Sequence, residues 1–189
     1  MKILLINGSI VGEKTKILLE AVKTELEKFS ADYEIKELNL EKYDMQFADG
    51  RPKDDYNEDT QSMIDEMEAA DGYIIATPIF QGSIPGALKN LFDLISPKVM
   101  RYKPVAIVAN GGTFQHHLVI ENQLKPILDY FRSLITPNYV YTQSAHFSHV
   151  NEIIDEDVKF RIEELARVFY YYMQMSSDLQ KGDNLSTDF

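Results

Sequence analysis

The sequence predicts a three-layer α/β/α sandwich, a doubly wound domain in which a five-stranded parallel sheet lies between two layers of helices. Two observations predict it. Short apolar runs alternate along the chain with segments in which apolar residues recur every three to four positions. The runs are apolar at consecutive positions, which is typical of strands that are buried on both faces.

Four of the apolar runs are expected to form inner strands: residues 2–7, 72–77, 104–110 and 138–142. The fifth run, residues 33–40, is more polar, as an edge strand would be. Helical periodicity appears in residues 14–29, 59–70, 84–95, 117–133 and 155–175. Strands joined through helices pair in parallel by right-handed crossovers, and five strands at this spacing favour the order 2-1-3-4-5.

The length of 189 residues fits a single domain. We predict one domain over residues 1–175 and a polar tail over residues 176–189, where the periodicity ends. The charged connection over residues 43–58 is longer than most loops, and we interpret it as a mobile surface segment. The alternative is that it forms part of a site edge or of a subunit contact.

Charge and composition narrow the function classes. The chain has 19 basic and 30 acidic residues, and its net charge of −11 opposes binding to nucleic acids and to anionic membranes. Because the sequence contains no cysteine, any redox chemistry must depend on a cofactor. No run approaches the ~18 apolar residues of a membrane span, and the N-terminal MKILLING is too short for a secretory signal. We therefore expect a cytoplasmic protein.

Ligands of doubly wound folds bind beyond the carboxyl ends of the strands, so the strand-to-helix loops are the candidate sites. The first loop, NGSIVGEKTK over residues 7–16, combines glycines and hydroxyls with a helix N-terminus, which suits a monophosphate. It lacks the glycine spacing of triphosphate and dinucleotide loops. An ordinary capped helix start is the alternative interpretation.

The second and third loops suit a flat ring. In TPIFQGSIPG, residues 77–86, Pro78 stiffens the strand exit and Gly82 allows a flat ligand to approach the backbone. Backbone amides at such a loop can bond the heteroatoms of a flavin edge. In ANGGTFQHH, which begins at residue 109, Gly111 and Gly112 keep bulky side chains away from the same edge.

These stretches resemble the NADPH-dependent FMN reductase family. ADGYIIATPIFQGSIPGALKNLFDLI (residues 70–95) looks like its signature, and VANGGTFQHHLVIENQLKPILDYF (residues 108–131) is similar to its fourth-strand region. The similarity runs from residue 3 to about residue 145 and is greatest to the flavin reductases of two-component sulfonate-utilising systems. The resemblance implies a flavodoxin-like fold, FMN as cofactor, NADPH or NADH as electron donor, and a homodimer or homotetramer.

The resemblance also implies a set of cofactor-binding residues. The phosphate loop corresponds to Ser9 and Thr15, with Lys14 or Lys16 as charge partners. The ring-binding loop corresponds to Pro78, Ile79, Phe80, Gln81, Gly82 and Ser83. The loop at the flavin edge corresponds to Gly111, Gly112 and Thr113.

Two positions depart from the family pattern. Val11 stands where many members carry Arg, so we expect backbone amides and lysines to hold the phosphate. Asn122 stands where the sulfonate-system reductases carry an aromatic residue, which leaves room for a tightly held FMN.

The implied reaction is hydride transfer from NADPH to FMN, and then electron transfer to free flavin, a quinone, an azo dye or a metal oxyanion. No side-chain acid or base is obligatory for the hydride step, so we predict no catalytic side chain. His146 and His149 form an H-x-x-H pair without carboxylate or cysteine context, so we predict no metal ligand. A flavin-dependent monooxygenase that receives reduced FMN is an implied partner. The alternative is a flavodoxin-type electron carrier without a substrate site, whose phosphate loop is usually richer in Thr than NGSIVGEKTK.

Overall fold

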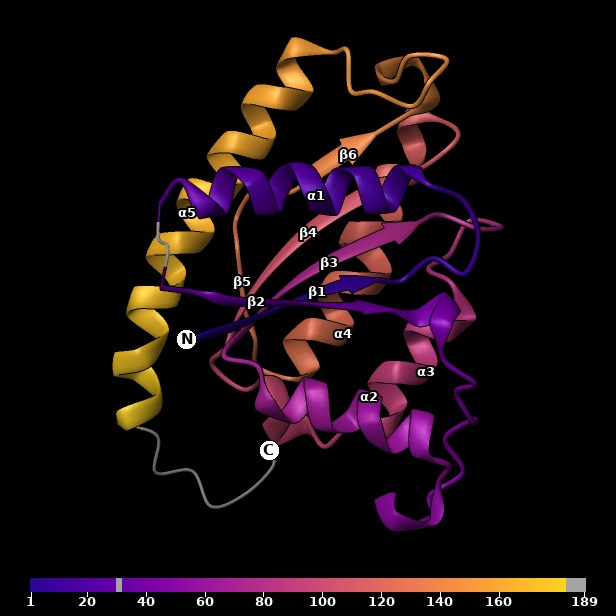
Figure 1. Cartoon of the computed structure of the whole chain (residues 1–189), viewed down its shortest axis with the longest axis vertical. Helices are drawn as coiled ribbons and strands as arrows, with labels where there is room; N and C mark the ends of the chain where they lie inside the picture. The colour runs from indigo at the N-terminus through magenta and orange to yellow at the C-terminus, as the bar shows by residue number, and fades with distance from the viewer. Residues whose placement is uncertain (30–31, 183–189) are drawn as a thin grey trace.

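Six parallel strands form the sheet of the computed structural model, which describes residues 1–29 and 32–182 (Figure 1). They are β1 (Lys2–Asn7), β2 (Glu34–Asn39), β3 (Gly72–Pro78), β4 (Pro104–Asn110), β5 (Leu134–Ile135) and β6 (Val140–Thr142). The order is β2-β1-β3-β4-β5, and β6 also pairs with β4. The predicted parallel sheet and its order 2-1-3-4-5 are confirmed, with one strand more than expected.

The additional strand arises because two short strands share the edge beside β4. The first residues of β4 pair with β5, and Val108–Asn110 pair with β6. Between the two strands lies Pro137, which has no N–H to donate to the ladder, so the chain leaves the sheet there. Thr136 marks the exit, because its hydroxyl donates to the Asn138 carbonyl at 2.9 Å.

Two helical layers cover the sheet. Helices α1 (Lys14–Glu27) and α5 (Glu156–Lys181) pack on one face (Figure 1). Helices α2 (Glu58–Ala69), α3 (Gly86–Leu94) and α4 (Lys125–Tyr130) pack on the other. The predicted three-layer α/β/α sandwich is therefore confirmed.

The predicted helix over residues 117–133 is wrong in one respect, because it is not a single regular helix. A 3₁₀ turn (Phe114–His117) and a π-helical turn (Ile120–Leu124) precede α4. Pro126 lies in the first turn of α4. Since a proline cannot donate to the carbonyl four residues earlier, a regular α-helix cannot continue through this point without a break.

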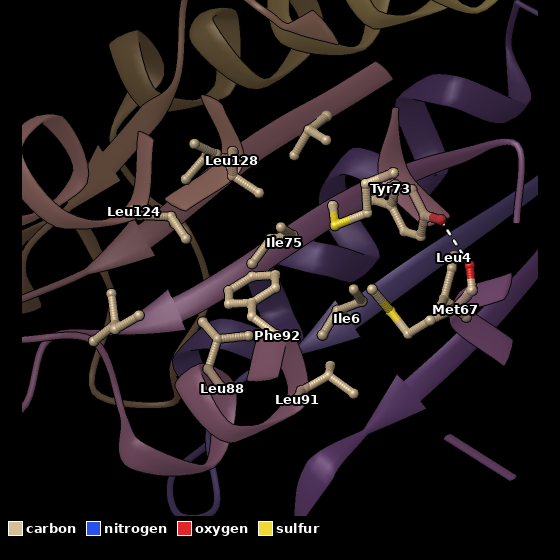
Figure 2. Close-up of a cluster of buried hydrophobic side chains, with 14 of the residues drawn as sticks. Leu4, Ile6, Met67, Tyr73, Ile75, Leu88, Leu91, Phe92, Leu124 and Leu128 are labelled. Carbon is tan, nitrogen blue, oxygen red and sulfur yellow. Dashed lines mark hydrogen bonds between the residues drawn. The ribbon is translucent and has the colours of Figure 1, made fainter. Parts of the chain in front are cut away.

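Alternate side chains of each inner strand enter opposite cores. Leu4 and Ile6 of β1 join the cluster under α2, α3 and α4, whereas Ile3 and Leu5 join the cluster under α1 and α5. Figure 2 shows the first cluster, in which the buried Tyr73 hydroxyl donates to the Met67 carbonyl at 2.6 Å. Burial of both faces explains why the strands are apolar at consecutive positions.

Helix α5 continues to Lys181, six residues beyond residue 175, where the domain was predicted to end. Its later turns are anchored: the buried Ser176 hydroxyl donates to the Tyr102 carbonyl at 2.7 Å, and a Cβ atom at Gly72 would overlap Met173. Residues 183–189 of the predicted tail lie outside the described residues. Neither α5 nor any other helix of the described chain is both long and apolar enough to cross a bilayer.

The connection over residues 43–58 is tied to the body of the protein. The buried Asn90 side chain donates to the Gln46 carbonyl and accepts from the Ala48 N–H, both at 2.9 Å. The Asn57 side chain donates to the Asp44 carbonyl at 2.7 Å and also caps α2. These bonds contradict the interpretation of this segment as a mobile loop.

Candidate functional site

A cavity of about 290 Å³, here called the loop cavity, lies beyond the carboxyl ends of β1, β3 and β4. It is lined by Ser9, Val11, Gly12, Glu13, Lys14, Thr15, Pro78, Phe80, Asn110 and Asn151. The first and second predicted loops therefore meet at one site. Asn110 and Asn151 join it from the end of β4 and from the loop after β6, and the sequence alone did not single them out.

The start of helix α1 forms one wall of the loop cavity. The first N–H groups of a helix have no acceptor in a preceding turn, and they carry a partial positive charge. Thr15 is only 3% exposed, and its hydroxyl has no hydrogen-bond partner among the described residues. A buried hydroxyl without a partner destabilises a fold, so this wall is suited to an added acceptor such as a phosphate oxygen.

Ser9 shapes the loop. Its hydroxyl donates to the Val11 carbonyl and accepts from the Val11 N–H at 3.2 Å, so its proton is already engaged within the loop. Its own N–H donates to the side-chain oxygen of Asn7 at 3.3 Å. Asn7 is fully buried, and its side-chain nitrogen lacks a partner within the described chain. A polar residue at the end of a buried strand was the signal that could have identified it.

The two lysines of the first loop differ in position. Lys14 lines the loop cavity. Its ammonium donates to the Ser144 hydroxyl at 2.7 Å and lies 5.4 Å from the centre of the Phe147 ring. The Lys16 ammonium pairs with Glu41 at 2.6 Å, and this pairing raises the pKa of Lys16. The structure does not bring Lys16 to the loop cavity, so Lys14 is the better candidate as a charge partner.

The ring-binding loop contains a closed hairpin. The N–H of Phe80 donates to the Ser83 carbonyl and the N–H of Ser83 to the Phe80 carbonyl, both at 2.9 Å. Gln81 and Gly82 lie at the tip with φ of +49° and +73°, as a tight two-residue turn with left-handed residues requires. Gly82 is therefore needed for the left-handed conformation of the turn. The sequence analysis had explained this glycine by the approach of a flat ligand to the backbone.

Two backbone donors are available in this loop. Pro78 has no N–H, and the N–H of Ile79 donates to the Asn110 carbonyl at 2.9 Å. The N–H groups of Phe80 and Ser83 close the hairpin. Those of Gln81 and Gly82 find no acceptor in the part of the chain that the structure describes, and both residues are exposed. Of the six predicted residues, these two can donate to a ring edge.

The third loop lies next to a second cavity. A Cβ atom at Gly111 would overlap the Tyr141 hydroxyl, so the absence of a side chain here makes room for Tyr141. Gly112 and Thr113 are exposed, and none of the three lines the loop cavity. The second cavity, of about 520 Å³, is lined by Phe114, His117, Tyr139, Tyr141, Gln143, His146, Asp157 and Arg161.

The chain is similar in sequence to known flavin reductases. Residues 1–147 match the model of the NADPH-dependent FMN reductase family. The chain is 52% identical over 166 residues to an NAD(P)H-dependent FAD/FMN reductase from Geobacillus thermodenitrificans, which covers 88% of this chain and 90% of that protein.

Solved structures show the same fold. An oxidoreductase from Corynebacterium diphtheriae superposes with a TM-score of 0.77 at 21% identity, covering 93% of this chain and 98% of that one. Flavodoxin 2 from Bacillus cereus superposes with a TM-score of 0.59 at 17% identity, covering 90% and 99%. The predicted flavodoxin-like fold and the predicted family are thus confirmed. The chain belongs to the NADPH-dependent FMN reductase family, whose members are oxidoreductases that use FMN with reduced nicotinamide as electron donor.

Proposed function

We propose that this protein holds FMN at the loop cavity, reduces it with NADPH or NADH, and passes the electrons to a small-molecule acceptor, with free flavin as the first candidate. The observation that carries the proposal is the buried Thr15 hydroxyl, which lacks a partner among the described residues at the start of α1, on the wall that also holds Lys14. The relative with 52% identity, an NAD(P)H-dependent FAD/FMN reductase, supports the same activity.

The phosphate would be held by the Thr15 hydroxyl, the first-turn N–H groups of α1 and the Lys14 ammonium. Backbone donors at a helix start combine direct hydrogen bonds with the partial charge of the helix dipole. Lys14 adds a charge-assisted contact, which is about twice as strong as a neutral one. Val11, in the position where many members carry Arg, does not contribute a charge.

The flavin ring would lie along Pro78 and Phe80, with the N–H groups of Gln81 and Gly82 as donors to its edge. When bound, FMN supplies the two-electron chemistry that connects reduced nicotinamide with the acceptor. The two N–H groups would stabilise negative charge that develops at the ring edge, and they are oriented before the reaction. The role of Gly111, Gly112 and Thr113 along the other ring edge remains a prediction.

NADPH oxidation under air, with and without added FMN, tests the activity. We expect oxidation that requires the protein and accelerates with FMN, and a parallel assay with NADH gives the donor preference. FMN binding without turnover of either nucleotide would indicate a flavodoxin-type electron carrier instead. A fluorescence titration in which FMN does not bind would contradict both functions.

Thr15→Val is expected to separate ligand binding from stability. Valine has nearly the shape of threonine but no hydroxyl, so it removes a buried group that lacks a partner in the described chain. We expect FMN affinity to fall about fivefold to tenfold, while the free energy of unfolding without ligand is unchanged or higher. Fluorescence titration and urea unfolding measure the two quantities. Lower stability with unchanged affinity would contradict the assignment.

The assembly and partners are part of the proposal. We expect a homodimer or homotetramer that delivers reduced FMN to a flavin-dependent monooxygenase, and a cytoplasmic location. Support for an assembly comes from large apolar side chains that are exposed on the strand-to-helix loops: Ile10, Val11, Phe80, Phe114 and Leu118.

A further inference from the structure

The tip of the ring-binding hairpin is held by a side chain that lies 40 residues further along the chain. The Ser83 hydroxyl donates to the side-chain oxygen of Gln123 at 2.7 Å, and the side-chain nitrogen of Gln123 donates to the Gly82 carbonyl at 3.1 Å. A single amide group therefore contacts two adjacent residues of the turn, once as an acceptor and once as a donor.

The turn needs such support. Gln81 adopts a left-handed φ of +49°, a conformation that costs ~1–2 kcal/mol in a residue with a Cβ atom. Two main-chain bonds between Phe80 and Ser83 close the hairpin, and short hairpins are marginally stable by themselves. Both residues at the tip are exposed, so packing does not hold them in place.

The backbone segment that carries Gln123 is anchored in the core. It belongs to the π-helical turn Ile120–Leu124, whose first and last residues are fully buried. Leu124 belongs to the buried cluster that Figure 2 shows. Such π-helical turns are rare and often occur at functional sites. Here the turn directs the Gln123 side chain toward the hairpin, while Ile120 and Leu124 of the same turn lie in the core.

We propose that Gln123 is a positioning residue that fixes the two N–H groups of Gln81 and Gly82 for the flavin ring; this inference rests on the proposed function. Each N–H lies in a planar peptide unit. The unit that contains the Gln81 N–H is held because its carbonyl, that of Phe80, accepts from Ser83. The next peptide unit contains the Gly82 N–H. The unit after it contains the Gly82 carbonyl, which accepts a hydrogen bond from the Gln123 side chain. Both donors are therefore oriented before ligand binds.

Gln123→Met tests the inference, because it keeps the length of the side chain and removes both contacts. We expect the affinities for FMN and for riboflavin to fall by the same factor, about fivefold to tenfold, since the ring and not the phosphate loses its donors. The absorption spectrum of the bound flavin should shift, and kcat for NADPH oxidation should fall more than KM for NADPH changes.

Gln61→Met is the matched control. Gln61 lies on α2, and its side-chain amide also holds a loop, because it donates to the Tyr56 carbonyl at 2.6 Å. That loop, residues 54–56, is not part of the hairpin. We expect a similar loss of stability from both variants and a change in the flavin spectrum from Gln123→Met alone. Equal flavin properties in the two variants would overturn the inference.

Two further variants cover the case in which Gln123→Met does not fold. Ser83→Ala removes one of the two contacts, and Gln123→Glu keeps the acceptor for Ser83 but loses the donor to Gly82. Ser83→Ala should produce a smaller effect of the same kind, and Gln123→Glu a larger one, because its carboxylate would face the Gly82 carbonyl and repel it. Unchanged flavin spectra in both would overturn the inference. Failure of the wild-type protein to bind FMN would instead contradict the proposed function.

Discussion

Replacing Lys14 with Glu is expected to weaken FMN binding about a hundredfold and to leave riboflavin binding unchanged. Lys14 lines the loop cavity beside the start of α1, where the phosphate is proposed to lie. A hydrogen bond to a charged group contributes ~1.5–3 kcal/mol, and a carboxylate in its place adds repulsion. Since ~1.4 kcal/mol corresponds to a factor of ten, the combined loss is about two factors of ten. Fluorescence titration with each flavin measures it.

Lys16→Glu is the matched control, because it changes the net charge equally and lies two residues further along the same helix. The Lys16 ammonium pairs with Glu41 and does not line the loop cavity. We expect its effect on FMN affinity to stay within about threefold, the scale of a screened surface charge. Equal effects from both variants would show that FMN senses the overall charge and would contradict a local contact with Lys14.

Gly111→Ala is expected to destabilise the fold by ~3 kcal/mol, the upper end of the usual range for overpacking. A Cβ atom there would overlap the Tyr141 hydroxyl and lie 3.1 Å from both Tyr141 Cζ and His116 Cβ. Tyr141 is only 5% exposed and its hydroxyl donates to the Thr113 carbonyl, so it cannot move aside freely. Urea unfolding of the protein without ligand measures the loss.

A double-mutant cycle identifies the cause. Tyr141→Phe removes the overlapping hydroxyl, so we expect Gly111→Ala to cost less in that background than in the wild type. Gly112→Ala serves as the control, because the nearest atom to its Cβ would be 4.0 Å away, and it should change stability by less than ~0.5 kcal/mol. Full stability of Gly111→Ala with loss of flavin binding would show that the glycine serves the ligand instead.

The sheet was predictable because each strand is marked by a run of apolar residues within its own short segment of sequence. Consecutive apolar residues such as those of β3 report burial on both faces, and the fixed hand of the crossovers restricts the strand orders that an alternation of strands and helices can adopt. The division of the edge into β5 and β6 was missed, because the run at residues 138–142 accounts for only one of the two strands. The π-helical turn was missed too, since Ile120, Leu124 and Leu128 have the same spacing of four that a regular helix produces.

The sequence was sufficient to predict which loops form the candidate site. It was not sufficient to predict which side chains and backbone N–H groups face the cavity. Sequence reasoning identified both loops that meet at the loop cavity. It could not separate Lys14 from Lys16, because the distinction depends on Glu41, which lies 25 residues away in sequence. It could not identify Gln123 for the same reason. Which backbone N–H groups remain available depends on the complete set of main-chain bonds, which only coordinates give.

The later turns of α5 are anchored beside the first residues of β3 and β4. Ser176 is tied to Tyr102, just before β4 begins, and Met173 packs against Gly72 at the first residue of β3. The loop cavity lies beyond the opposite ends of the same two strands, where Pro78 and Asn110 line it. Attachment of the protein to an electrode or a resin through a residue on the last turn of α5 would therefore leave the proposed flavin site facing the solution.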